Sequence, residues 1–102
     1  MHRTFFVYIL ASAPFGAIYI GVTSDIVARI EENREGRGST HVAKYKIFRL
    51  VHLEEFSNAP DAILREKRLK RWRRSWKDAL IERDNPGWHD LYNSVRGDPL
   101  LP

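Results

Sequence analysis

Four residues of this sequence have side chains of types that can take part in phosphodiester hydrolysis. Tyr8 and Tyr19 stand in two short apolar runs, Arg29 follows in a segment with helical spacing, and Glu66 is the one acid between residues 65 and 77. A phenol can orient a water or take its proton, a guanidinium binds phosphate oxygens in bidentate fashion, and a carboxylate can hold Mg²⁺ or Mn²⁺. Phosphodiester hydrolysis needs an activated water, stabilised negative charge and help for the leaving oxygen. These residue types cover those needs.

Each of these residues, taken alone, also has a structural explanation. A single glutamate among basic neighbours can simply neutralise them, and such exposed pairs are common and weak. The stem of Arg29 can lie along a helix surface with its charge in water, and tyrosines on strands often pack half-buried. The residues therefore need a common context before they indicate a site.

The basic residues of the chain are concentrated in one stretch. The net charge is +4, and residues 65–77 hold eight Lys or Arg against one acid, which is typical of a surface that binds a polyanion. A solvated helix face is the alternative explanation. If the polyanion is DNA, its phosphates are expected to contact Arg37, Arg65, Lys67, Arg68, Lys70, Arg71, Arg73, Arg74 and Lys77.

The spacing of apolar residues predicts the elements that position the two tyrosines and the arginine. Residues 4–10 and 17–22 are rich in β-branched and aromatic side chains and are joined by a segment with Pro and Gly. This pattern predicts a β-hairpin that carries both tyrosines. Residues 25–36 predict a helix capped by Thr23 or Ser24, and this helix carries the arginine.

The second half of the chain is predicted to contain one further strand and two longer helices. The expected segments are a mobile glycine-rich loop at 36–40, a helical turn at 41–45, a strand at 48–56, a helix at 61–72, and a helix at 76–83 capped by Ser75. The residues expected to face the core from these helices are Ala62, Ile63, Leu69, Trp72, Trp76, Leu80 and Ile81. Trp88 is also assigned to the core, and packing is preferred over base stacking for all three tryptophans.

The order strand, strand, helix, strand, helix, helix predicts an α+β fold, a three-stranded antiparallel sheet flanked by helices. A chain of 102 residues with 43% hydrophobic residues is long enough for one core. We place the domain at residues 1–92 and a loosely ordered tail at 93–102. The absence of cysteine excludes disulfides and thiolate metal sites. No segment is long and apolar enough for a signal peptide or a membrane span, so we expect a cytoplasmic protein.

The two tyrosine-bearing runs resemble the motif that names the GIY-YIG nuclease superfamily. Residues 19–21, Tyr-Ile-Gly, match the second half literally, and residues 7–9, Val-Tyr-Ile, stand in place of the first half, as in the small single-domain bacterial members. Residues 24–29 resemble the helix that carries the family arginine, and residues 62–67 resemble the helix that carries its glutamate. The resemblance covers most of the chain.

This resemblance implies a DNA endonuclease that hydrolyses phosphodiester bonds with Mg²⁺ or Mn²⁺ and serves DNA repair or recombination. Tyr8 and Tyr19 would activate or orient the attacking water, Arg29 would bind the phosphate, and Glu66 would bind the metal. An ordinary phenol, with a pKa of about 10, is a poor base at neutral pH. Positive charge from Arg29 or the metal would therefore have to lower the pKa of the tyrosine that acts as the base.

Asn33 departs from the family pattern, because these proteins usually carry a histidine four residues after the arginine. An amide does not titrate near neutral pH. Three explanations stay open: a weaker enzyme, a proton acceptor elsewhere such as His41 or a tyrosine, or an altered position. Asn33→His is expected to raise cleavage.

Two further hypotheses compete with the nuclease. A nucleic-acid-binding module that keeps the fold but cleaves weakly would show metal-independent, steeply salt-dependent binding. An interaction domain whose basic helix docks an acidic protein explains neither the tyrosine pair nor Arg29. The sequence does not predict which DNA structure is preferred, because it contains no groove-reading motif.

Overall fold

The strand that carries Tyr8 is the central strand of a three-stranded antiparallel sheet, with strand order β2-β1-β3. The structure, a computed structural model, describes residues 3–96. The elements in this range are β1 (Phe5–Ala11), β2 (Ile18–Thr23), α1 (Ile26–Arg34), α2 (Thr40–Tyr45), β3 (Arg49–Phe56), α3 (Ala59–Arg71), α4 (Arg74–Asp84) and α5 (Tyr92–Arg96). The predicted α+β fold and its antiparallel sheet are confirmed. Among these residues no helix is long and apolar enough to cross a membrane.

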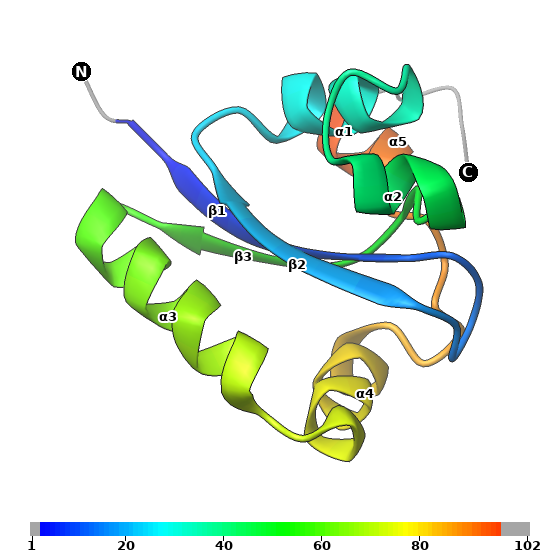
Figure 1. Ribbon diagram of the computed structural model, residues 1–102. Helices are drawn as coiled ribbons and strands as arrows, with labels where there is room; N and C mark the ends of the chain where they lie inside the picture. The colour runs from blue at the N-terminus through cyan, green and yellow to red at the C-terminus, as the bar shows by residue number, and fades with distance from the viewer. Residues whose placement is uncertain (1–2, 97–102) are drawn as a thin grey trace.

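The sheet separates two hydrophobic cores, because successive side chains of a strand point to opposite faces. Val7, Ile9 and Ala11 of β1 pack with α3 and α4 on one face. Tyr8 and Leu10 pack with α1, α2 and α5 on the other. Figure 1 shows this three-layer arrangement, with α3 and α4 below the sheet and α1, α2 and α5 above it.

Two predicted helix caps are wrong. Asp25, rather than Thr23 or Ser24, caps α1 by accepting a hydrogen bond of 3.1 Å from a backbone N–H of the first turn. The helix α4 begins at Arg74 without a side-chain cap, so Ser75 lies inside its first turn. The hydroxyl of Thr23 instead accepts from the backbone N–H of Asp25, at 3.1 Å, which fixes the turn between β2 and α1.

The buried stripe predicted for α3 and α4 is too wide. Ile63 is 41% exposed and Trp76 is 51% exposed, whereas Leu69 and Ile81 are fully buried. Helical residues are offset by about 100° per position, so Ile63 turns outward beside the inward-facing Ala62. Trp76 lies in the first turn of α4, directly after the turn that joins α3 to α4 (Figure 1).

The segment after residue 92 is more regular than the sequence predicts. The helix α5 occupies Tyr92–Arg96, and Val95 packs against the core on the α1 side of the sheet. Tyr92 is only 8% exposed, which explains why the helix forms despite its short length. The rest of the predicted tail, residues 97–102, lies outside the described residues.

Candidate active site

The two tyrosines of the motif lie on the same face of the sheet. Tyr8 pairs with Gly21 across the two strands, and Tyr19 pairs with Leu10. The tyrosines are therefore diagonal neighbours, within reach of one another on a single face. Their ring centroids lie 6.5 Å apart, with the planes tilted by 34°. The two strands therefore pair in a register that brings both tyrosines side by side, which a shared site requires.

The glycine of the motif makes room for the ring of Tyr8. A Cβ atom on Gly21 would come within 2.2 Å of the Tyr8 hydroxyl oxygen, a separation that side-chain carbons do not tolerate. The phenol thus crosses directly over the backbone of β2, the edge strand. Sequence analysis treated this glycine only as part of the motif, and the structure shows that it places the Tyr8 hydroxyl.

The Tyr8 hydroxyl lies where charges from α1 and α3 meet. Burial raises the pKa of Tyr8 to about 12; Tyr19 adds to the rise, Arg29 opposes it, and Glu66 and then Glu32 add to it again. Arg29 does lower the pKa of Tyr8, as expected, but the opposing causes outweigh it. A phenol with this pKa keeps its proton near pH 7 and is available to donate a hydrogen bond.

Arg29 and Glu66 belong to helices on opposite faces of the sheet, α1 and α3 (Figure 1), and both influence the pKa of Tyr8. Arg29 is half-buried in α1, and none of the ion pairs formed within residues 3–96 involves its guanidinium. Glu66 of α3 has a side chain that is only 15% exposed, and its carboxylate lies 3.4 Å from the Nζ of Lys70. The site therefore combines an unpaired cation with a largely sheltered anion. Glu32, on α1 one turn after Arg29, is a nearby carboxylate that sequence analysis did not single out.

Asn33 has a structural role that the sequence does not reveal. It is 2% exposed, and its Oδ1 accepts a hydrogen bond of 3.2 Å from the backbone N–H of Ser39, the N-cap of α2. A Cβ on Gly38 would come within 1.9 Å of the same oxygen. Its Nδ2 finds no partner within the described chain. Asn33 thus fastens the glycine-rich loop to α1.

The remaining predicted site residues of this region lie on its exposed side. His41 is exposed on α2, where its ring stacks at 4.9 Å from the ring of Tyr45. Arg37 is exposed in the glycine-rich loop and donates from Nε to the carboxylate of Glu35 at 2.8 Å. The structure gives neither residue a contact with the tyrosine pair.

The basic residues predicted to bind DNA fall into two groups. Arg65 donates two hydrogen bonds, of 2.8 and 2.9 Å, to the carboxylate of Glu54 on β3, and Arg74 binds Asp78 at 2.7 Å. These two guanidiniums already have partners inside the protein, as does Lys70 beside Glu66. The residues that form no ion pair within residues 3–96 are Lys67, Arg68, Arg71, Arg73 and Lys77. These five residues are therefore better placed to contact DNA phosphates.

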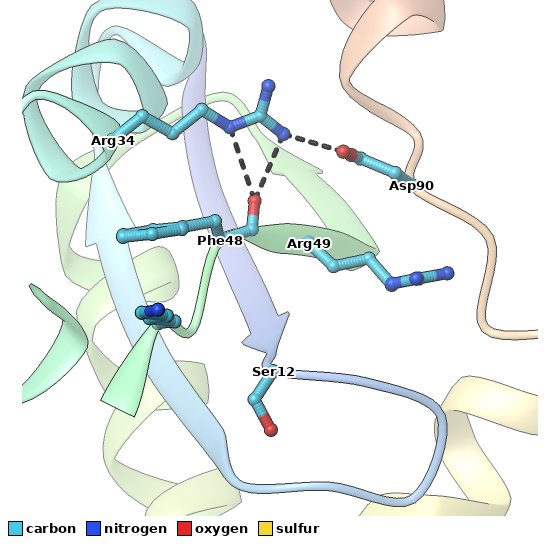
Figure 2. Close-up of a pocket in the computed structure, with 6 residues that line it drawn as sticks. Ser12, Arg34, Phe48, Arg49 and Asp90 are labelled. Atoms are coloured by element: carbon cyan, nitrogen blue, oxygen red, sulfur yellow. Dashed lines mark hydrogen bonds and ion pairs between the residues drawn. The ribbon is translucent and has the colours of Figure 1, made fainter. Parts of the chain in front are cut away.

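A separate hollow lies between β3 and the end of α1 (Figure 2). Its volume is about 520 Å³, and it is lined by Ser12, Arg34, Lys46, Phe48, Arg49 and Asp90. Arg34 donates to the backbone oxygen of Phe48 at 3.0 Å and to Asp90 at 2.6 Å. These bonds tie α1 to β3 and to the segment before α5. The tyrosine pair does not line this hollow, so the hollow is not the candidate active site.

The family of the chain follows from comparison with known proteins. The model of the GIY-YIG catalytic domain matches residues 4–79. The chain belongs to the GIY-YIG family, whose domain implies nuclease-type activity. The match includes the tyrosine pair, Arg29 and Glu66.

Individual relatives are small bacterial proteins named UPF0213. The UPF0213 protein of Lacticaseibacillus paracasei is 29% identical over 86 residues, which cover 84% of this chain and 96% of the relative. The UPF0213 protein of Staphylococcus aureus is 31% identical over 77 residues, which cover 76% and 93%. The solution NMR structure of the UPF0213 protein of Bacillus halodurans has a TM-score of 0.54 at 27% identity, covering 88% of this chain and 95% of that one.

Proposed function

We propose that this protein is a metal-dependent DNA endonuclease that hydrolyses phosphodiester bonds. The observation that carries the proposal is the Tyr8 hydroxyl, which lies over Gly21 and is influenced by Tyr19, Arg29 and Glu66 together. The proposal is supported by the fact that residues of three elements, the hairpin, α1 and α3, all influence this one phenol. The family resemblance is the support for a role in DNA repair or recombination.

The residues of the site divide the work on the phosphate. Arg29, which has no ion-pair partner within residues 3–96, binds non-bridging phosphate oxygens and stabilises the charge that builds on them. Tyr8 keeps its proton at physiological pH, where even an ordinary phenol is neutral, and its raised pKa makes it a still poorer base; it therefore donates a hydrogen bond that orients the attacking water or a phosphate oxygen. Tyr19 is half-buried and borders the same position, where it assists in orienting that water.

Glu66 is the residue that would hold a divalent cation. Within residues 3–96 no cluster of three or more His, Cys, Asp or Glu side chains offers a metal cage. One sheltered carboxylate suits Mg²⁺ or Mn²⁺, because Mg²⁺ keeps several waters and is often bound through one or two carboxylates plus substrate phosphates. When bound, such an ion lowers the pKa of a coordinated water and neutralises phosphate charge.

The alternative function is a nucleic-acid-binding module that cleaves weakly. The observation in its favour is Asn33, whose amide is buried and bonded to the backbone of Ser39 and so supplies no titrating group. The tyrosine pair and the unpaired Arg29 favour the nuclease instead, because binding alone needs neither.

Nicking of supercoiled plasmid tests the proposed function. Wild-type protein is expected to cut in Mg²⁺ or Mn²⁺ and to be inactive in chelator. Glu66→Gln is expected to lose activity by about 100-fold or more. Glu55→Gln is a matched control, since Glu55 is an exposed residue of β3, and it should cut normally. Equal nicking in chelator and in Mg²⁺ would contradict metal dependence.

A further inference from the structure

Trp76 is exposed where sequence analysis expected a core residue. It is 51% exposed in the first turn of α4, whereas Trp88 is fully buried and Trp72 packs against the core. Aromatic side chains placed on a basic surface are the feature by which proteins bind unpaired nucleic-acid bases.

Neighbouring side chains hold the indole of Trp76 in place. The ring of Trp72 meets it at a centroid distance of 6.0 Å and an angle of 86°, an edge-to-face contact. The guanidinium carbon of Arg73 lies over the Trp76 ring, 4.7 Å from its centroid. Trp72 is partly buried and packs against the core, so its edge-to-face contact and the Arg73 guanidinium over one face favour one orientation of the exposed ring, here called the platform.

Positive charge surrounds this platform. Arg73 precedes the ring and Lys77 follows it, and neither forms an ion pair within residues 3–96, whereas Arg74 is paired with Asp78 and Lys70 with Glu66. The Nζ of Lys77 donates to the backbone oxygen of Lys70 at 3.3 Å, which keeps that ammonium at the corner between the two helices. A flat apolar ring within a cationic border matches a nucleotide, which combines a flat base with a phosphate.

The platform follows directly after the helix that carries Glu66. Trp72 is the C-cap of α3, six positions after Glu66, and a helix rises about 1.5 Å per residue, so Trp72 lies roughly 9 Å beyond Glu66 along the axis. Figure 1 shows α3 and α4 on the same face of the sheet, joined by a short turn. A strand with its phosphate at Glu66 could reach Trp76 within a few nucleotides.

We propose that Trp76 stacks on an unpaired base of the DNA strand whose phosphate is cleaved. The preferred substrate is then DNA with a single-stranded segment beside the cleavage position, because a base within a continuous duplex is already stacked on its neighbours. This inference rests on the proposed nuclease function and adds a substrate class to it.

Equilibrium binding of two DNAs tests the stacking site. The probes are a fluorescently labelled oligothymidylate and a labelled hairpin duplex with the same number of phosphates. Binding is measured in Glu66→Gln protein, so that neither probe is cut. The variants are Trp76→Leu, which removes the aromatic ring, and Trp76→Phe, which keeps one. Tyr45→Leu is a matched control, because Tyr45 is 50% exposed and has the Nζ of Lys44 over its ring at 5.3 Å.

Trp76→Leu is expected to weaken oligothymidylate binding by about tenfold and to leave hairpin affinity almost unchanged. Trp76→Phe should retain most of the affinity, and Tyr45→Leu should bind both DNAs normally. Oligothymidylate should also quench the tryptophan fluorescence of the parent protein, and this quenching should be lost in Trp76→Leu. An unchanged oligothymidylate affinity in Trp76→Leu overturns the inference. An equal loss on both DNAs also overturns it, because phosphate binding or the fold would then be affected.

The proposed stacking site and the proposed nuclease function can be refuted independently. If plasmid cleavage depends on Glu66 but Trp76→Leu binds oligothymidylate like its parent, the stacking site is wrong and the nuclease stands. If no DNA is cut but the Trp76-dependent preference for oligothymidylate is found, the catalytic function is wrong. The stacking site would then belong to a binding module.

Discussion

Tyr8 shows how the environment of one side chain sets its chemistry. The expectation from the sequence was a phenol made more acidic by positive charge. The structure instead raises the pKa of Tyr8 to about 12, chiefly through burial, with Tyr19 and Glu66 adding to the effect of burial and Arg29 opposing it. The Tyr8 phenol is therefore a donor at neutral pH in the metal-free protein.

A spectroscopic pH titration of the phenols tests this assignment. Tyr8 should ionise near pH 12 instead of its ordinary value of 10, and Tyr8→Phe should remove this late step from the phenolate absorbance. Because the folded protein favours the neutral form of Tyr8, this phenol contributes its full share of stability below pH 10. That contribution is lost as the pH rises toward 12. A Tyr8-dependent phenolate signal at or below pH 10 would contradict the account.

Gly21 offers a second test at the level of one residue. Gly21→Ala would place a Cβ within 2.2 Å of the Tyr8 hydroxyl, so the ring must move. Overpacking of this kind costs about 1–3 kcal/mol in the free energy of unfolding, and we expect cleavage to fall with the displaced phenol. Thermal unfolding and plasmid nicking measure the two effects. A fully active, equally stable variant would show that the Tyr8 position over Gly21 is unimportant.

The connection between α1 and α2 depends on the side chain of Asn33. Its Oδ1 binds the backbone of Ser39, and Gly38 packs directly against it. A histidine there would be larger and would have to displace the loop. Replacing Asn33 is therefore expected to cost stability. The sequence had linked this position only to proton transfer.

Substitution of Asn33 separates these two roles. We expect Asn33→His to lower the free energy of unfolding by about 1–2 kcal/mol. The predicted gain in cleavage should then be seen when the nicking rate is expressed per folded molecule. Asn33→Ala, which lacks both the hydrogen bond and the imidazole, should lose stability without any gain. Chemical denaturation and nicking rates of both variants provide the measurement. A His variant no faster than wild type per folded molecule would show that the amide is not a defect.

The contact between β3 and α3 rests on a buried network around Glu54. His52 lies 2.8 Å from the Glu54 carboxylate, and Arg65 binds both of its oxygens. Burial alone would raise the pKa of Glu54, but the hydrogen bonds from His52 and Arg65 outweigh it and lower the pKa to about 2. Arg65 therefore has a structural role at this interface in addition to its predicted contact with phosphate.

Acid unfolding tests the Glu54 network. A carboxylate with a depressed pKa stabilises the fold above its ordinary value of 4.5, and this contribution is lost as the pH falls from 4.5 toward 2. Glu54→Gln should lower the free energy of unfolding at neutral pH by about 1–3 kcal/mol, and the difference from wild type should shrink in that acid range. Glu55→Gln serves as the exposed control. A difference that stays constant with pH would contradict the shift.

At the scale of the molecule, the sheet separates two cores, and the residues of the proposed active site come from elements on both of its faces. The two runs of β-branched and aromatic residues, joined by a segment with Pro and Gly, predicted a hairpin that carries both tyrosines. The exposure of Trp76, the buried bond of Asn33 and the raised pKa of Tyr8 could not be predicted. Each depends on contacts between distant segments, such as the corner of α3 and α4, which local spacing does not encode.

The proposed nuclease and the alternative binding module differ in one measurable quantity. Glu66→Gln protein at saturating concentration is mixed with labelled DNA that contains a single-stranded segment. Binding is measured by anisotropy, and single-turnover cleavage in Mg²⁺ is measured on the same samples. We expect wild-type affinity and a cleavage rate lower by about 100-fold or more. Unchanged cleavage by Glu66→Gln, with binding intact, would contradict the catalytic role of Glu66 and with it the proposed active site.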